Sequence, residues 1–373
     1  MKTFTRDYRF GSITDDLFSK YYGTLTPCVF DIETTGLSAG GRQTSRVILT
    51  AMLIRISNGV QITQYLAEQP YEEDQVLRNT LRFLADHEID YLITYNGMSF
   101  DIPFVNRRLE ALHLPYRLSM YDLDLYAWLR KNTVLPERLP SMKQKSVERY
   151  FRIASDRDDI ITGRDSVKLY YEYAGTHSSV IEKIILTHNR EDVLQLYRVL
   201  QELRQNTDDL LKKDNFHQAE ADFGFPVGEH ADLTVRPKLT GRELALRGLQ
   251  HRTVALQRKE IMENADLDES DPEIAFSATF FPDFESNISA SFRASASDFE
   301  VTAPVERRGK SVYVDLRSIP FRSELARRLA LTELNGYVND YLILCDEKEN
   351  NYQEINVLSA LLLDQVYRRV RSV

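Results

Sequence analysis

Two acidic side chains stand two positions apart at the end of an apolar run. Residues 27–33 have the composition of a buried strand, and they end in Asp31-Ile32-Glu33. Because side chains alternate along a strand, Asp31 and Glu33 lie on one face, roughly 6–7 Å apart. Like charges at the end of an apolar strand are costly unless a cation lies between them, and divalent ions with oxygen ligands are the common solution. The pair therefore indicates a metal site, with solvated or capping acids as the alternative.

A second acid follows the next apolar strand. In residues 95–104 the strand ends at Asn96-Gly97 and a helix begins close to Pro103, which places Asp101 at or near the helix N-cap. Taken alone, this segment is equally typical of a capping aspartate with proline in the first helical turn.

A third segment pairs an imidazole with a carboxylate. His188 and Asp192 are four residues apart within a predicted helix, so both side chains reach the same point from one helical face. By itself this spacing also fits a surface pair.

The three segments together, in this order, resemble the DEDD-type 3′–5′ exonucleases, which have a ribonuclease H-like fold. The pattern of that family is Asp-x-Glu-Thr, then Asn-x-x-x-Phe-Asp, then Tyr or His a few residues before Asp, and each part is present here. The second segment is similar to that of replicative polymerase proofreading domains, and residues 24–204 resemble the ribonuclease H-like domain of bacterial YprB-type proteins. One departure is the four-residue offset of His188, since the histidine branch of the family usually has one residue more and the tyrosine branch has four.

This resemblance implies a function and a set of roles. We expect hydrolysis of phosphodiester bonds at the 3′ end of single-stranded DNA or RNA, with two Mg²⁺ or Mn²⁺ ions as cofactors and His188 activating or orienting water. The implied metal ligands, which together with His188 form the catalytic set, are Asp31, Glu33, Asp101 and Asp192. The implied substrate contacts are Thr34, Thr35, Leu37, Asn96 and Phe100. The rival hypotheses are an inactive nucleic-acid-binding protein and a partner-binding protein whose second half does the work.

Basic residues suggest where a nucleic-acid backbone would lie. Residues 141–152 predict a basic helix containing Lys143, Lys145, Arg149 and Arg152, which is a candidate for holding phosphates or simply a solvated face. In the second half, Arg242, Arg247, Arg252, Arg258 and Lys259 form a candidate strand-guiding surface or ordinary surface charge.

The elements that must position these residues indicate an α/β domain. Strands are predicted at 46–56, 60–66 and 91–95, with an Asn-Gly hairpin between the first two. Helices are predicted at 71–85, 102–112, 123–131, 142–150 and 178–203. We expect a ribonuclease H-like mixed sheet flanked by helices over residues 1–212. Beyond about residue 225 the apolar period changes to two, which predicts a smaller β-rich α+β domain of unknown role over residues 213–373, closed by a helix at 354–371.

Composition, charge and cysteine content limit the class of protein to which this chain can belong. The 373 residues are 43% hydrophobic and 28% charged, as in soluble two-domain proteins. A net charge of −9 argues against coating nucleic acid by bulk electrostatics, so any contact must be local. The two cysteines predict buried free thiols rather than disulfide or zinc chemistry. With no long apolar run and no secretory start, we expect a cytoplasmic protein without membrane contacts; the sequence does not identify protein partners.

Overall fold

A computed structural model gives the fold of most of the chain. It describes residues 1–9, 22–23, 25–36, 45–153, 163–205, 207–212, 216–227, 233–250, 276–279, 289–293, 298–318 and 323–371. These residues fall into two compact units. The first holds the described residues up to Leu210 except Tyr22 and Gly23, which cluster with the described residues after Leu210.

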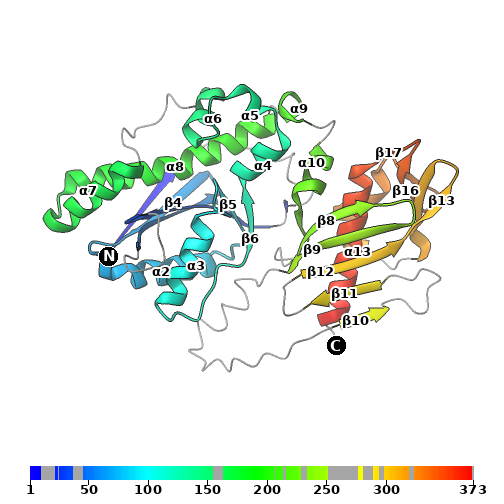
Figure 1. Ribbon diagram of the computed structural model, residues 1–373, viewed down its shortest axis with the longest axis horizontal. Helices are drawn as coiled ribbons and strands as arrows, with labels where there is room; N and C mark the ends of the chain where they lie inside the picture. Colours follow the sequence, from blue (N-terminus) through cyan, green and yellow to red (C-terminus); the bar gives the residue numbers. More distant parts are fainter. Residues whose placement is uncertain are drawn as a thin grey trace. The chain divides into compact units, whose positions relative to one another are not determined.

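The first unit is built on a mixed six-stranded sheet (Figure 1). Its strands in spatial order are β1 (Lys2–Tyr8), β4 (Gly59–Leu66), β3 (Val47–Ile56), β2 (Pro27–Thr34), β5 (Tyr91–Thr94) and β6 (Tyr121–Asp124). The pairs from β1 to β2 are antiparallel, whereas β2, β5 and β6 run parallel. The central strand β2 is buried along most of its length, because helices cover both faces of the sheet.

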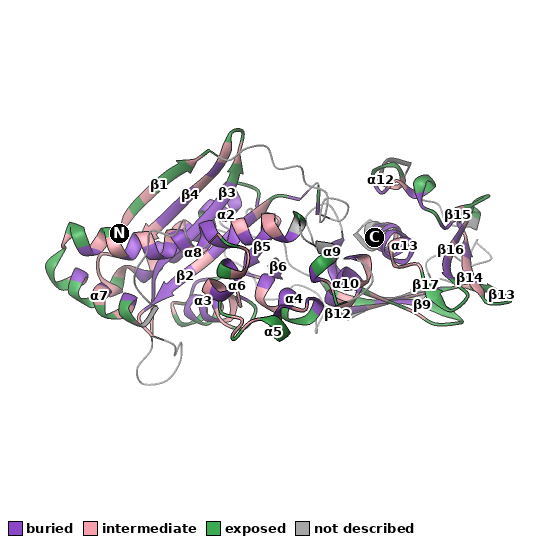
Figure 2. Ribbon diagram, turned by 90° about the horizontal axis from the view of Figure 1, so that it is seen from above, coloured by how far each residue is buried: buried purple, intermediate pink, exposed green. Residues whose placement is uncertain are grey.

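Helices cover both faces of this sheet. Alternate residues of β2, such as Phe30, pack into a core with α2 (Glu73–Asp86) and α3 (Asp101–Ala111). The other face is covered by α7 (Gly163–Thr176) and α8 (Ser179–Gln205), whose Tyr170 and Ile185 pack on Ile48 and Leu66. Figure 2 shows the consequence, with β3 buried along most of its length and β1 largely exposed at the sheet edge. The predicted ribonuclease H-like arrangement of a mixed sheet between helices is confirmed.

A buried ion pair ties α2 and α3 to the sheet. Arg108 of α3 donates through Nε and Nη2 to the two carboxylate oxygens of Glu73, at 2.8 and 2.7 Å. The same carboxylate accepts the backbone N–H of Val47 at the start of β3, at 2.8 Å. Three elements therefore meet at one carboxylate whose charge is compensated inside the core.

Shorter helices complete this unit, and one predicted boundary needs correction. They are η1 (Pro70–Glu72), α4 (Leu125–Asn132), α5 (Leu135–Arg138), α6 (Gln144–Tyr150) and α9 (Thr207–Leu210). The helix predicted at 123–131 begins at Leu125, because the Asp124 carboxylate accepts the N–H of Ala127 and so caps it, while Leu123 and Asp124 belong to β6. Strands β1 and β6 and helix α7 were absent from the prediction.

The second unit has two antiparallel sheets. The first follows the order β10 (Phe276–Thr279), β11 (Ser289–Arg293), β12 (Asp298–Pro304), β9 (Glu243–Gln250), β8 (Leu233–Leu239), β7 (Phe225–Val227). The second contains β13 (Glu306–Arg308), β14 (Ser311–Asp315), β16 (Tyr341–Asp346), β15 (Tyr337–Val338) and β17 (Glu349–Asn350). The helical segments are α10 (Phe216–Phe223), η4 (Leu316–Ser318), α12 (Ser323–Arg328), η5 (Leu331–Glu333) and α13 (Tyr352–Arg371). Helix α13 packs against α10, β7, β8 and β16. The predicted β-rich character of the second half is confirmed; the domain boundary at 212 stays a prediction.

Candidate active site

Asp31 and Glu33 lie on the face of β2 that α8 covers. Their neighbours Phe30 and Ile32 point into the α2–α3 core, so alternation along the strand turns the two acids the other way. Glu33 is buried and Asp31 is half-buried. The structure thus places both carboxylates between the sheet and one helix.

Asp101 reaches the same strand from α3. It is the first residue of α3, with Phe100 at the N-cap position. Its Oδ1 accepts the backbone N–H of Ile32 at 3.3 Å. The last pair between the parallel strands β2 and β5 is Val29 with Ile93. The N–H of Ile32 therefore lies past the part of β2 that β5 pairs with, and the Asp101 carboxylate accepts it there. Asp101 therefore bonds β2, between Asp31 and Glu33, and it occupies the first helical position instead of the N-cap.

His188 and Asp192 approach from α8. The Nε2 atom of His188 lies 3.6 Å from Oε1 of Glu33 and 3.8 Å from Oδ2 of Asp192. One ligand atom from each of these three residues lies within 4.8 Å of the other two, which is an arrangement that could hold a metal ion. The predicted helical face of His188 and Asp192 is thus turned toward the two acids of β2.

The carboxyl group of Asp31 lies within electrostatic reach of the other three acids. Burial raises the pKa of Asp31 well above its usual value, and the charges of Asp101, Asp192 and Glu33 raise that pKa further. Burial also raises the pKa of Glu33 to about 7, with Asp192 adding to the effect. The pKa of Asp101 rises to about 7 for the same first reason, burial.

This donor set fits divalent metal ions. Carboxylate oxygens are the ligands that Mg²⁺ and Mn²⁺ prefer, and a cation among the four acids would offset the cost of keeping their charges close together in a buried place. The imidazole of His188 adds a ring nitrogen, Nε2, beside Glu33 and Asp192. The residues present therefore match a site for hard divalent cations.

Two further acids lie behind the Asn96–Asp101 loop and were missed by sequence reasoning. Asp124 accepts the backbone N–H groups of Asn96 at 2.8 Å and Met98 at 3.2 Å, which fixes the loop before Asp101. Asp122 accepts the Thr94 hydroxyl at 2.9 Å, and burial followed by the charge of Asp124 raises the pKa of Asp122. The only sequence signal was the Asp-Leu-Asp alternation, which the predicted helix obscured.

The same loop has little conformational freedom. Asn96 has a left-handed φ of 71°, and a Cβ added at Gly97 would lie 2.2 Å from the hydroxyl oxygen of Thr94. Glycine is therefore required at this position, and the loop holds Asp101 in place.

The predicted substrate contacts differ in their availability. The Thr34 hydroxyl donates to the carbonyl of Gly36 at 2.6 Å, and the Thr35 hydroxyl accepts the N–H of Arg46 at 2.8 Å, so both are engaged in the turn after β2. Phe100 is half-buried and packs on Phe104, with ring centroids 5.4 Å apart. Asn96 is half-buried, and Leu37 lies outside the described residues.

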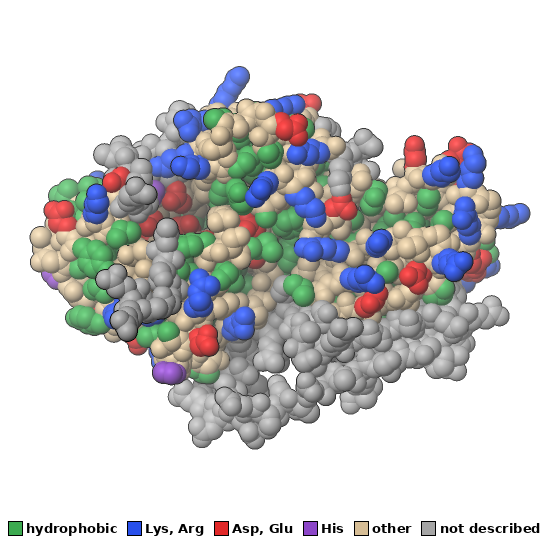
Figure 3. All heavy atoms as spheres, in the orientation of Figure 1, with side chains coloured by type: hydrophobic (Ala, Val, Ile, Leu, Met, Phe, Trp, Pro, Cys, Tyr) green, Lys and Arg blue, Asp and Glu red, His purple; other side chains and the backbone are tan. Residues whose placement is uncertain are grey.

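The neighbours of Lys143 in the sequence, Met142 and Gln144, are hydrogen-bonded to the segments that contain Asp101 and Asp192, respectively. Lys143 is exposed and immediately precedes α6. On one side of it, the Tyr95 hydroxyl donates to the carbonyl of Met142 at 2.5 Å; on the other, Gln144 Nε2 donates to the carbonyl of Asp192 at 2.8 Å. Figure 3 shows blue Lys and Arg side chains over α5 and α6, above a hollow in which acidic side chains appear red. A basic rim beside an acidic centre suits a phosphate backbone held near metal ions.

The second basic stretch is described only in part. Arg247 forms an exposed ion pair with Glu300 on the neighbouring strand, at 2.7 Å, and Arg242 is exposed. Arg252, Arg258 and Lys259 lie outside the described residues.

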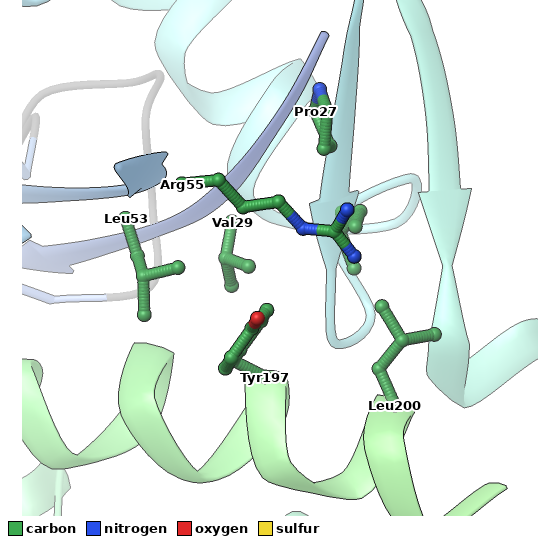
Figure 4. Close-up of a pocket in the computed structure, with 7 residues that line it drawn as sticks. Pro27, Val29, Leu53, Arg55, Tyr197 and Leu200 are labelled. Carbon is green, nitrogen blue, oxygen red and sulfur yellow. The ribbon is translucent and has the colours of Figure 1, made fainter. Parts of the chain in front are cut away.

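An apolar pocket lies away from this chemistry. Its lining residues are Pro27, Val29, Leu53, Arg55, Ile93, Tyr197 and Leu200. In Figure 4 the side chains of Tyr197 and Leu200 rise from α8 toward the start of β2. The pocket is therefore at the opposite end of β2 from Asp31 and Glu33, and it reflects packing of the helix on the sheet.

Asn189 and Gln64 are the other residues that sequence reasoning missed. Asn189 is fully buried and donates from Nδ2 to Oδ2 of Asp31 at 2.8 Å. Gln64 of β4 donates from Nε2 to Oδ1 of Asn189, also at 2.8 Å. A signal was present: Gln64 is the one polar residue in the inward-facing alternation Ile62, Gln64, Leu66.

Comparisons with known proteins agree with the fold of the first unit. Residues 28–204 match the family model described as the RNase H superfamily. The Uncharacterized protein YprB of Bacillus subtilis (strain 168) is 27% identical over 186 residues, which is 49% of this chain and 43% of that protein. The chain thus spans less than half the length of this relative. The sheet order shows the predicted ribonuclease H-like fold, and residues 28–204, slightly less than half of the chain, are similar to the RNase H superfamily.

Among solved structures, the family B DNA polymerase from the hyperthermophilic archaeon Pyrobaculum calidifontis covers 49% of this chain and 24% of its own. The two are 19% identical, with a TM-score of 0.38. Within the described parts of the chain, no helix is long and apolar enough for a membrane crossing.

Proposed function

We propose that the first unit is a metal-dependent nuclease that hydrolyses phosphodiester bonds in nucleic acids. The observation that carries this proposal is the convergence of acids from β2, α3 and α8. Asp101, Asp192 and Glu33 all raise the pKa of Asp31, and Glu33, His188 and Asp192 each place one ligand atom within 4.8 Å of the other two. A buried cluster of like charges is costly to maintain without a cation. Asp31, Glu33, Asp101 and Asp192 would hold two Mg²⁺ or Mn²⁺ ions.

The side chains divide the chemistry between them. When bound, two divalent ions stabilise negative charge on the attacking and leaving oxygens of the phosphodiester. The four carboxylates would hold these ions. Asp101 is kept in place by the backbone N–H of Ile32 and by the loop before it, which Asp124 fixes. His188 accepts a proton from the attacking water, because imidazole is suited to proton transfer near neutral pH and Nε2 faces the carboxylates.

The same nitrogen of His188 could instead be a metal ligand, as its distances to Glu33 and Asp192 allow. Replacement by alanine separates these roles. If His188 is the proton acceptor, His188→Ala loses about 10²–10⁴-fold in hydrolysis rate while Mn²⁺ affinity stays unchanged. If it is a ligand, Mn²⁺ affinity falls as well.

The preferred substrate is the 3′ end of single-stranded DNA or RNA. This proposal is supported by the order and spacing of the three motifs, which resemble those of DEDD-type exonucleases, and by the exposed Lys143 beside the site. The rival, an inactive nucleic-acid-binding protein, is disfavoured by the presence of all four carboxylates.

End-labelled single-stranded DNA and RNA, incubated with Mn²⁺ and either the wild type or Asp31→Ala, test the proposal. We expect ladders of shortened products from the 5′-labelled strand with the wild type, and intact strands with Asp31→Ala. Equal digestion by both proteins, or none by either, would reject nuclease activity at this site. Products cut from the interior would reject only the exonuclease part.

A further inference from the structure

A chain of buried amide groups leads from β4 to the first carboxylate. Leu186 O, Gln64, Asn189 and Asp31 are linked in that order by hydrogen bonds of 3.0, 2.8 and 2.8 Å. Gln64 and Asn189 are 3% and 0% exposed, so water does not compete for these groups. We propose that Asn189 and Gln64 are positioning residues that hold Asp31 in its metal-binding orientation, an inference that rests on the proposed function.

The donor and acceptor roles in this series of hydrogen bonds are fixed by the backbone carbonyl of Leu186. A backbone carbonyl such as that of Leu186 can only accept, so the side-chain NH₂ of Gln64 must face it. The same NH₂ faces Asn189, which must therefore present its oxygen to Gln64. The NH₂ of Asn189 then has to face Asp31, where only a donor suits an ionised carboxylate. Each amide can hold one orientation without losing a hydrogen bond.

The sheet is arranged to admit this connection. Asp31 of β2 is paired with Ala51 of β3, and Ala51 is paired with Gln64 of β4, so the three form one row across the sheet. Paired neighbours in adjacent strands point to the same face, which here is the face under α8. Ala51 is fully buried and has only a methyl group, so Asn189 can extend from α8 over it to contact both ends of the row.

The hydrogen bond from Asn189 to Asp31 should affect metal binding more than it affects folding. One oxygen of Asp31 is occupied by Asn189, which restricts how the carboxylate can turn and supplies the donor that an ionised, crowded acid needs. Outer-shell groups that orient a ligand typically change metal affinity or activity by about 10–100-fold when removed.

Mn²⁺ affinity measured by isothermal titration calorimetry on the full chain tests the inference, with thermal unfolding as the check on folding. We expect Asn189→Leu to bind Mn²⁺ about 10–100-fold more weakly than the wild type. Gln64→Glu keeps the shape of the side chain but offers acceptors, so the Asn189 amide must turn and present its oxygen to Asp31. We expect Gln64→Glu to weaken Mn²⁺ binding more than Gln64→Leu, whereas a packing role alone predicts the opposite order.

Two controls separate the outcomes. Gln61→Leu, on the same strand and bonded only to Asp7 among the contacts resolved for it, should bind Mn²⁺ as the wild type does. Asp31→Asn should lose binding. If Asp31→Asn loses binding while all the Asn189 and Gln64 variants bind like the wild type, the inference fails and the proposed function stands. If the wild type does not bind Mn²⁺, or Asp31→Asn binds equally well, the proposed function fails and the inference with it.

Discussion

The carboxyl group of Glu33 is placed where ionisation is unfavourable unless a cation is present. Burial raises its pKa from 4.5 to about 7, so over that interval the folded protein binds a proton that the unfolded chain releases. The contribution of Glu33 to stability is therefore greatest below pH 4.5 and is lost as the pH rises through about 7.

The metal-free protein should consequently lose stability on the alkaline side through this residue. Glu33→Gln removes the titrating group. We expect the unfolding free energy of Glu33→Gln, minus that of the wild type, to be larger at about pH 8 than at about pH 5. Since one pKa unit corresponds to about 1.4 kcal/mol, the effect should reach a few kcal/mol. Urea unfolding in EDTA at both pH values measures it, and a wild type that gains stability over Glu33→Gln with rising pH would contradict the assignment. Added Mn²⁺ should reverse the order at alkaline pH, because metal binding needs the ionised form.

At the residue scale, the sequence predicted the acids but not the groups that hold them. The shared face of Asp31 and Glu33 follows from the period of a strand, and that of His188 and Asp192 from the period of a helix. Their meeting with Asp101 was implied only by resemblance, since local spacing does not fix tertiary contacts. Gln64 and Asn189 are 125 positions apart, and their bond depends on a cross-sheet row that no local pattern reveals.

At the scale of elements, the predicted strands and helices of the first unit mostly have the expected positions, and the failures have physical causes. Strand β1 is an edge strand with polar residues on much of its surface, so its apolar alternation is weak. Strand β6 is four residues long and leads directly into α4, so the apolar residues of both gave one continuous helical pattern. Tertiary pairing, rather than local propensity, determines these strands.

The buried Glu73–Arg108 pair should be the most sensitive joint between elements. Arg108→Met removes one partner and leaves the Glu73 charge uncompensated, which should cost about 3–5 kcal/mol of unfolding free energy. Arg78→Met is a matched control, because Arg78 lies on α2 and its pair with Asp74 is exposed, with a distance of 3.9 Å. We expect the control to change stability by about 0.5 kcal/mol or less. Equal effects in urea unfolding would contradict a structural role for the buried pair.

At the scale of the whole molecule, the chain has two compact units, and the change of apolar period near residue 225 indicated the β-rich second one. The sequence did not indicate that Tyr22 clusters with the second unit, where its hydroxyl donates to the buried Glu220 at 3.0 Å. Tyr22 therefore belongs to the second unit although it precedes β2 in the sequence. A single domain boundary at residue 212 does not describe this.

The candidate site lies entirely within the first unit, so it should survive without the second. We expect a fragment of residues 1–212 to bind Mn²⁺ with the affinity of the full chain. The reason is that the five site residues and the groups described above in contact with them all precede residue 212. Calorimetry on the fragment and the full chain measures this. A folded fragment that binds no Mn²⁺ would show that the second unit contributes to the site.

The central claim is that acids from three distant segments bind shared divalent ions. Crystals grown with Mn²⁺ and measured near its absorption edge test this claim directly, because anomalous scattering locates the ions independently of any assay. We predict peaks among the carboxylates of Asp31, Glu33, Asp101 and Asp192. The account would be contradicted if the four carboxylates were ordered at saturating Mn²⁺ but showed no anomalous peak. It would also be contradicted if anomalous peaks appeared only elsewhere on the protein.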